Sequence, residues 1–138
     1  MEKYNVHNLY NGQFYEKEFM VTENMGELYA QISQDYNPIH LDAEYAKTSR
    51  FGQKIVHGML MGSFISGIIG NEFPGAGSIY LNQELVFKRP VYYHAKISIR
   101  VEIAGINLEK RHVLLKTQCY DMEHNLLVDG NAKILLEG

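Results

Sequence analysis

The chain has 138 residues, of which 46% are hydrophobic and 21% are charged, as in an ordinary globular domain. The length suits one domain rather than two. The formal net charge of −3 provides no basic field for nucleic acid or an anionic membrane, and no apolar run reaches the ~18 residues of a membrane-spanning helix.

The cysteine content and the first residues bear on the compartment. Cys119 is the only cysteine, so no internal disulfide can form, which favours a reducing environment. The first residues contain no apolar run typical of a signal peptide. We therefore expect a cytoplasmic protein that binds neither nucleic acid nor a membrane and forms a single domain over residues 1–138.

The N-terminal part of the chain predicts one strand and two helices. Residues 13–21 follow an Asn-Gly turn signal and are expected to form a strand. Thr22 is a plausible N-cap for a helix over 23–33. Apolar residues recur in that helix at i, i+3, i+4 and i+7: Met25, Leu28, Tyr29 and Ile32. A short second helix is expected within 42–49.

The most apolar segment, residues 58 to about 73, predicts a long buried helix, because apolar side chains occur on nearly every side of it. Glycine is frequent in it, although each glycine costs ~1 kcal/mol relative to alanine in a helix. Small residues gather along one side of the helix: Gly62, Ser63, Ser66, Gly67 and Gly70. We expect this stripe to let the helix approach a sheet closely.

Four segments with period-2 alternation follow and predict the remaining strands: 80–88, 95–105, 111–121 and 126–136. This order of elements predicts an α+β fold, in which a curved antiparallel sheet of at least five strands wraps the helix that starts at residue 58. A single sheet around one helix leaves a strand edge and an apolar rim. We therefore expect a homodimer or a higher homo-oligomer in which sheets join.

Chemistry is concentrated in residues 35–40, where Asp35 and His40 lie five positions apart. Pro38 lacks an N–H and disfavours helical backbone in the residue before it, and Asn37 can close an Asx-turn. The segment should therefore turn back and aim Asp35 and His40 at a common point. A turn alone does not need an acid and a base, whereas proton transfer to a small molecule does.

Three segments resemble the MaoC-like (R)-specific enoyl-CoA hydratases: residues 34–40 with Ala46, residues 55–60 and residues 77–81. The resemblance follows the family's order over nearly the whole chain. It points in particular to the short single-hotdog hydratases that feed polyhydroxyalkanoate synthesis. The chain differs at Gln34, where the family commonly has glycine or another small residue.

The resemblance implies a hotdog fold and reversible addition of water to a trans-2-enoyl thioester of coenzyme A, without a metal or redox cofactor. It implies that Asp35 and His40 hold and activate the water, with Asp35 passing a proton to C2. A helix that begins at Gly58 presents free N–H groups and the positive end of its dipole. We therefore expect the Gly58 backbone N–H to stabilise the enolate oxygen, and Ser63, Asn37 and His57 to bind substrate or support the dyad.

Structural roles are the alternatives for several of these residues. The Asp-Tyr-Asn-Pro segment can be a simple turn, His57 a packing or capping residue, and Ser63 a small packing residue. Cys119 lies on an apolar strand face and is expected to be buried and inert.

Two other functions remain open for this fold. An acyl-CoA thioesterase usually places its carboxylate on the long helix, where this chain has only Glu72 at the end. A non-catalytic acyl-thioester binding module would bind ligand without turnover. A carrier-protein thioester could also replace acyl-CoA. Charge alone suggests four candidates for phosphate contacts: Lys47, Arg50, Lys88 and Arg89. Met61 and Phe64 suggest a pocket for short, C4–C6, acyl chains.

Overall fold

The computed structural model describes residues 3–137 and contains five strands and four helices within them. In chain order these are β1 (Phe14–Met20), α1 (Glu23–Ser33), α2 (Pro38–Leu41), α3 (Ala43–Lys47), α4 (Gly58–Asn71), β2 (Ser78–Phe87), β3 (Lys96–Asn107), β4 (His112–Asp121) and β5 (Leu126–Leu136). The predicted strands and the helix over 23–33 are confirmed, with small shifts at their ends. The expected single domain also includes residues 1, 2 and 138, which lie outside the described residues.

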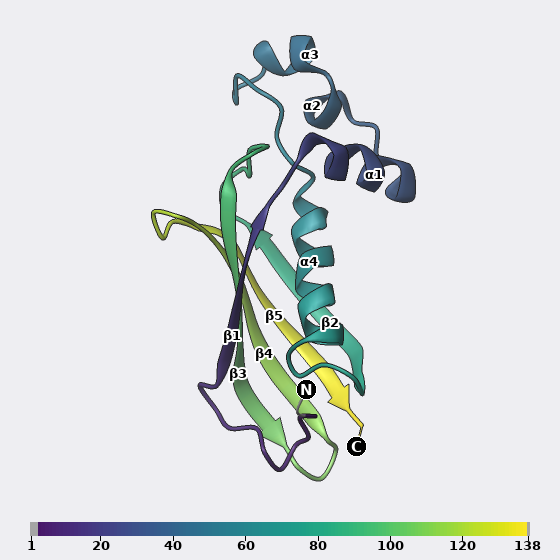
Figure 1. Ribbon diagram of the computed structural model, residues 1–138, viewed down its shortest axis with the longest axis vertical. Coiled ribbons are helices and arrows are strands. Elements are labelled where there is room, and N and C mark those ends of the chain that lie inside the picture. The colour runs from purple at the N-terminus through teal and green to yellow at the C-terminus, as the bar shows by residue number, and fades with distance from the viewer. Residues whose placement is uncertain (1–2, 138) are drawn as a thin grey trace.

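The five strands form one antiparallel sheet in the order β1-β3-β4-β5-β2. The sheet curves around α4, while α1, α2 and α3 lie together beyond one end of it (Figure 1). This α+β arrangement of a curved sheet around a long helix confirms the layout that the sequence predicts, and it is the hotdog fold that the family resemblance implies. Within residues 3–137 no helix is long and apolar enough to cross a membrane.

The hydrophobic core lies between α4 and the concave face of the sheet. Since successive side chains of a strand point to opposite faces, alternate residues of the central strands reach this core. In β3 they are Ile97, Ile99, Val101 and Ile103, and in β4 Val113, Leu115, Thr117 and Cys119. From α4 the buried residues are Leu60, Met61, Ile65, Ile68 and Ile69. Burial raises the pKa of the Cys119 thiol to about 12, which agrees with an inert side chain.

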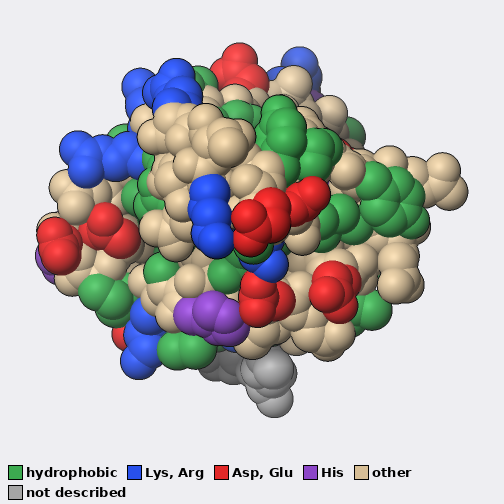
Figure 2. Space-filling model, turned by 90° about the horizontal axis from the view of Figure 1, so that it is seen from above, with side chains coloured by type: hydrophobic (Ala, Val, Ile, Leu, Met, Phe, Trp, Pro, Cys, Tyr) green, Lys and Arg blue, Asp and Glu red, His purple; other side chains and the backbone are tan. Residues whose placement is uncertain are grey.

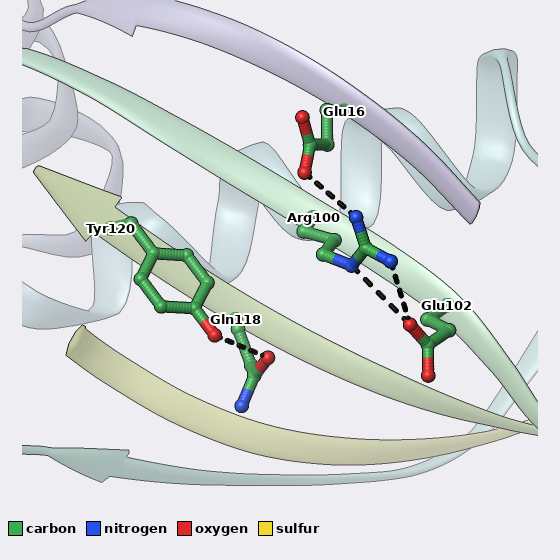
Figure 3. Close-up of polar contacts among 5 residues, drawn as sticks. All are labelled: Glu16, Arg100, Glu102, Gln118 and Tyr120. Carbon is green, nitrogen blue, oxygen red and sulfur yellow. Dashed lines mark hydrogen bonds and ion pairs between the residues drawn. The ribbon is translucent and has the colours of Figure 1, made fainter. Parts of the chain in front are cut away.

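The convex face of the sheet carries paired polar groups, among them an outer cluster drawn in Figure 3: Glu16, Arg100, Glu102, Gln118 and Tyr120. Arg100 Nη1 lies 2.8 Å from Glu16 Oε1, and Arg100 Nη2 lies 2.8 Å from Glu102 Oε1. The Tyr120 hydroxyl donates to Gln118 Oε1 at 2.7 Å. The polar groups of the outer cluster therefore bond to one another.

The structure corrects two expectations for α4. The helix ends at Asn71 rather than near residue 73. The proline at position 74 disfavours helical backbone in the residue before it, which is consistent with the earlier end. Burial on nearly every side is also wrong, because the small residues predicted to face a sheet lie largely on an exposed side. Among the three glycines of this stripe only Gly62 approaches the sheet closely, since an added Cβ would lie 3.0 Å from Leu85 Cδ1. At Gly67 and Gly70 it would meet nothing within 4 Å.

Helix α1 begins as predicted, with Thr22 Oγ1 accepting a hydrogen bond from the Met25 N–H. Its apolar stripe is nevertheless largely exposed, since Leu28 is 49% and Ile32 83% accessible, while Tyr29 packs against the core. Gly26 and Ala30 are the residues that α1 buries. Figure 2 looks onto this end of the molecule and shows hydrophobic side chains at the surface between charged ones. A helical period therefore locates the helix but does not say what covers its apolar side.

Candidate active site

Short-range hydrogen bonds shape the segment between α1 and α2. Asp35 Oδ1 accepts from the Asn37 N–H at 3.1 Å, and Asn37 Oδ1 accepts from the Ile39 N–H at 3.2 Å. The predicted Asx-turn at Asn37 is confirmed, and it caps α2, in which Pro38 occupies the first turn. Asn37 therefore builds the turn that presents Asp35 and His40.

His40 is held by its backbone and by one ring nitrogen. Its Nδ1 lies 2.9 Å from the Ile55 carbonyl oxygen, and the Tyr93 hydroxyl donates to the His40 carbonyl at 3.0 Å. A carbonyl oxygen can only accept, so Nδ1 carries the proton of that bond. Nε2 is then the nitrogen available to a ligand.

His57 lies directly against this pair and is 1% exposed. Its Nε2 is 3.0 Å from the Asp35 carbonyl oxygen, and its ring stacks on the His40 ring with centroids 4.0 Å apart. The ligating atoms of Asp35, His40 and His57 come within 4.8 Å of one another. The structure thus brings Asp35 and His40 together as predicted, and adds His57 to form a three-residue cluster.

The surroundings of His40 favour its neutral form. Burial lowers the pKa of its imidazole, and nearby His57 acts in the same direction. The hydrogen bond to Ile55 and the charge of Asp35 oppose this shift without reversing it. A neutral His40 with a protonated Nδ1 offers a lone pair on Nε2, as a general base requires.

A pocket of about 400 Å³ opens beside this cluster and is lined by Asp35, His40, His57 and Gly58. Its apolar wall includes Val56, Met61, Phe87, Val91 and Val128. Three basic residues also line it: Arg50, Lys88 and Arg89. Lys47, the fourth cation that charge alone suggested, lies instead in a separate cleft and pairs with Glu44 at 3.1 Å.

Gly58 is the first residue of α4 and faces this pocket. His57 occupies the N-cap position, but its side chain makes no capping hydrogen bond, so the first-turn N–H groups lack a side-chain acceptor. A Cβ added at Gly58 would lie 2.8 Å from Phe87 Cε1. Glycine therefore lets the Phe87 ring pack closely against the helix start.

Several known proteins are similar to this chain in sequence and in fold. A family model described as "MaoC like domain" matches residues 8–122. The chain belongs to the MaoC-like family. It is 41% identical over 108 residues to an (R)-specific enoyl-CoA hydratase of Aeromonas caviae, covering 78% of this chain and 81% of that protein. An (R)-specific enoyl-CoA hydratase of Rhodospirillum rubrum is 36% identical over 116 residues, covering 84% and 80%.

Solved structures of MaoC-like proteins agree with the fold over nearly the full chain. An unliganded R-hydratase from Pseudomonas aeruginosa superimposes with a TM-score of 0.91 at 37% identity, covering 96% of this chain and 84% of that one. The (R)-hydratase from A. caviae involved in polyhydroxyalkanoate biosynthesis gives a TM-score of 0.91 at 36% identity, covering 94% and 98%. The resemblance read from the sequence is confirmed.

Not every candidate of this MaoC-like chain reaches the pocket. Ser63 is exposed, its Oγ lies 3.5 Å from the Met59 carbonyl oxygen, and it does not line the pocket. Phe64 stacks on Phe19 with centroids 4.4 Å apart and is likewise absent from the lining. Glu72 pairs with Lys17 at 2.7 Å, away from the dyad.

Sequence reasoning missed the residues that reach the dyad from distant parts of the chain. Tyr93 lies 53 positions after His40, and the Ile55 carbonyl lies 15 positions after it. Gly26 is the one local signal, since a Cβ there would clash with the Tyr93 hydroxyl. A glycine inside α1 thus marks where Tyr93 passes to reach α2.

The three-residue cluster has donor types that could also hold a metal ion. His40 and His57 each bond a backbone carbonyl through one nitrogen, as metal-bound histidines usually do as well. The same groups, a carboxylate beside a neutral imidazole, are those that acid–base chemistry requires.

Proposed function

We propose that this MaoC-like protein catalyses the reversible addition of water to trans-2-enoyl-CoA, giving (R)-3-hydroxyacyl-CoA. One observation carries this proposal: Asp35 and His40 line the same pocket as the uncapped start of α4 at Gly58. The pocket therefore combines proton-transfer groups with a donor for a developing negative charge. Relatives at 41% and 36% identity that are named (R)-specific enoyl-CoA hydratases support the same reaction.

The reaction needs one water molecule, held between the Asp35 carboxylate and His40 Nε2. These groups remove a proton from the water as its oxygen attacks C3 of the enoyl thioester. The electrons of the double bond move onto the thioester oxygen, and the Gly58 N–H at the positive end of α4 stabilises this enolate. The proton taken from the water returns to C2 through Asp35. Both groups then arrive on one face, which is a syn addition.

The pocket walls support an acyl-CoA substrate. Arg50, Lys88 and Arg89 place positive charge beside an apolar pocket, which suits the phosphates of an acyl carrier such as coenzyme A. Met61 is fully buried and contributes to the lining, which supports a preference for short C4–C6 acyl chains. The chemistry involves no redox step, and we assign no metal or redox cofactor.

We further propose that the enzyme acts as a cytoplasmic homodimer. Strand β2 is an edge of the sheet and exposes apolar side chains, with Ile79 at 44%, Leu81 at 48% and Val86 at 53% accessibility. An unpaired apolar edge is a common site of association with a second copy. The single, buried cysteine is compatible with a reducing compartment. Light scattering should give twice the chain mass of 15.9 kDa, and a monomer in solution would contradict the dimer.

The test of the proposed function is a crotonyl-CoA assay with the wild-type protein. We expect the absorbance of the enoyl thioester to fall, the product to be oxidised by an (R)-specific dehydrogenase, and no free thiol to appear. Release of free coenzyme A would indicate thioester hydrolysis instead. Binding of crotonyl-CoA without any turnover would indicate a binding module.

A further inference from the structure

His57 is the least exposed polar side chain of the site, and it contacts three other residues there. Nε2 lies 3.0 Å from the Asp35 carbonyl oxygen. One ring face stacks on the His40 imidazole at 4.0 Å, and the Tyr29 ring meets His57 edge-on at 5.0 Å. The residue therefore touches both members of the dyad and stands immediately before Gly58.

The hydrogen bonds define the protonation of the His57 ring. Because a carbonyl oxygen only accepts, Nε2 must donate to Asp35. Nδ1 is buried and has no hydrogen-bond partner within residues 3–137. A second proton on Nδ1 would leave a charged, unpaired N–H buried against another imidazole, which is costly. The geometry corresponds to a neutral ring with its proton on Nε2.

We propose that His57 is the positioning residue of the dyad, because its Nε2–H fixes the backbone of Asp35 while its ring face fixes the plane of the His40 imidazole. One side chain thereby sets both proton-transfer groups relative to the start of α4. This inference rests on the proposed function and assigns His57 no direct contact with the reacting atoms. It goes beyond capping or packing, since the N-cap of α4 has no side-chain hydrogen bond.

Two variants separate the two contacts. His57→Gln keeps an amide N–H that can donate to Asp35 but removes the ring that covers His40. His57→Phe keeps an aromatic face against His40 but removes the donor. His7→Gln is the matched control, since His7 is exposed in the N-terminal segment and far in sequence from the site.

The pH profile of kcat/KM distinguishes positioning from a purely structural role. The charged and titratable groups around His40 are Asp35, His57, the Tyr93 hydroxyl and the basic lining of the pocket: Arg50, Lys88 and Arg89. Removing the ring in His57→Gln admits water to His40, so the acid limb of the profile should move to higher pH. In His57→Phe the ring still excludes water from His40, so the acid limb should move less than in His57→Gln, while kcat falls by up to ~10²-fold because Asp35 is no longer tied.

A measurement on the wild-type protein tests the proposal without any variant, so it does not depend on whether the variants fold. Nitrogen-15 NMR of the imidazole rings at pH 7 should show His57 protonated at Nε2 only and His40 protonated at Nδ1 only. Protonation of His57 at Nδ1, or at both nitrogens, would overturn the proposal.

The kinetic outcomes are equally decisive. Wild-type kcat and pH profile in both His57 variants would overturn the proposal, as would a loss explained entirely by a lower fraction of folded protein. A wild-type protein that hydrates no enoyl-CoA would instead overturn the proposed function, and the NMR result would still decide the state of His57.

Discussion

Two polar clusters of this protein differ in how completely their own side chains satisfy them. In the outer cluster, Arg100 lies between Glu16 and Glu102 (Figure 3). The Arg100 guanidinium also covers the Phe14 ring, 3.7 Å from its centroid. At the pocket, Asp35 and His40 line a cavity, and His57 Nδ1 is buried without a partner in the described chain. A satisfied cluster stabilises a surface, whereas the unsatisfied one keeps its hydrogen-bonding capacity for a ligand.

The largest expected effect comes from breaking the pocket cluster at His40. In His40→Asn, the side-chain amide can still donate to the Ile55 carbonyl, but the Nε2 lone pair is lost. We expect kcat for crotonyl-CoA hydration to fall by ~10²–10⁴-fold, the usual contribution of a positioned acid–base group. The melting temperature should change little. Equal kcat in the variant and the wild type would remove His40 from the chemistry.

The pH dependence of hydration should show which form of His40 is active. Burial lowers the pKa of His40, so its neutral, water-activating form persists to lower pH than in an exposed histidine. Activity should therefore decline only as the pH falls through this lowered pKa. A profile of kcat/KM whose acid limb lies above the ordinary histidine value of ~6.5 would contradict the assignment.

A smaller effect is expected at the start of α4. In Gly58→Ala, the new Cβ would approach the Phe87 ring at 2.8 Å, and the ring must turn away, which alters the pocket next to the oxyanion donor. We expect kcat/KM to fall by ~10-fold to 10²-fold, within the range of a displaced binding group. Adding Phe87→Ala should restore part of the loss. Unaltered kinetics in Gly58→Ala would show that the packing of Phe87 against the start of α4 does not affect hydration.

The smallest effect is expected in the outer cluster. Arg100→Gln removes two partly exposed ion pairs, to Glu16 and Glu102, and each such pair contributes ~0.2–1 kcal/mol. The free energy of unfolding, measured by chemical denaturation, should decrease by about the sum of the two contributions, while hydration kinetics stay at the wild-type level. A large loss of activity in Arg100→Gln would mean that the two clusters are coupled.

The sequence predicts those features that depend on neighbouring residues. The α1 boundaries, the Asx-turn at Asn37 and the alternation of β3 all follow from local patterns, and each is confirmed. The meeting of Asp35 and His40 belongs to this group, because both lie on one short turn. The local sequence was sufficient to predict that part of the site.

Ser63 shows where reasoning along a helix fails. It lies five residues after Gly58, and at ~100° per residue its side chain points roughly 140° away from that of Gly58. It therefore faces solvent while Gly58 faces the pocket. Proximity along α4 did not place it at the dyad.

Apart from Gly26, which marks the path of Tyr93, contacts between distant segments carried no local signal. The bond from Tyr93 to His40 and the bond from His57 to Asp35 join parts of the chain 53 and 22 positions apart. They depend on how the helical segment α1–α3 packs against the end of the sheet, which composition and periodicity do not specify. The same packing decides which side of α1 is buried, and local periodicity did not predict it.

Asp35 offers the most direct test of the central claim, that the unsatisfied pocket cluster performs the hydration. Asp35→Asn keeps an oxygen that can accept from the Asn37 N–H, so the turn should survive while the carboxylate is lost. The measurement is the rate of crotonyl-CoA hydration by folded Asp35→Asn beside the wild type and Arg100→Gln. We predict a loss of ~10²–10⁴-fold in Asp35→Asn alone. Wild-type turnover by folded Asp35→Asn would contradict the account.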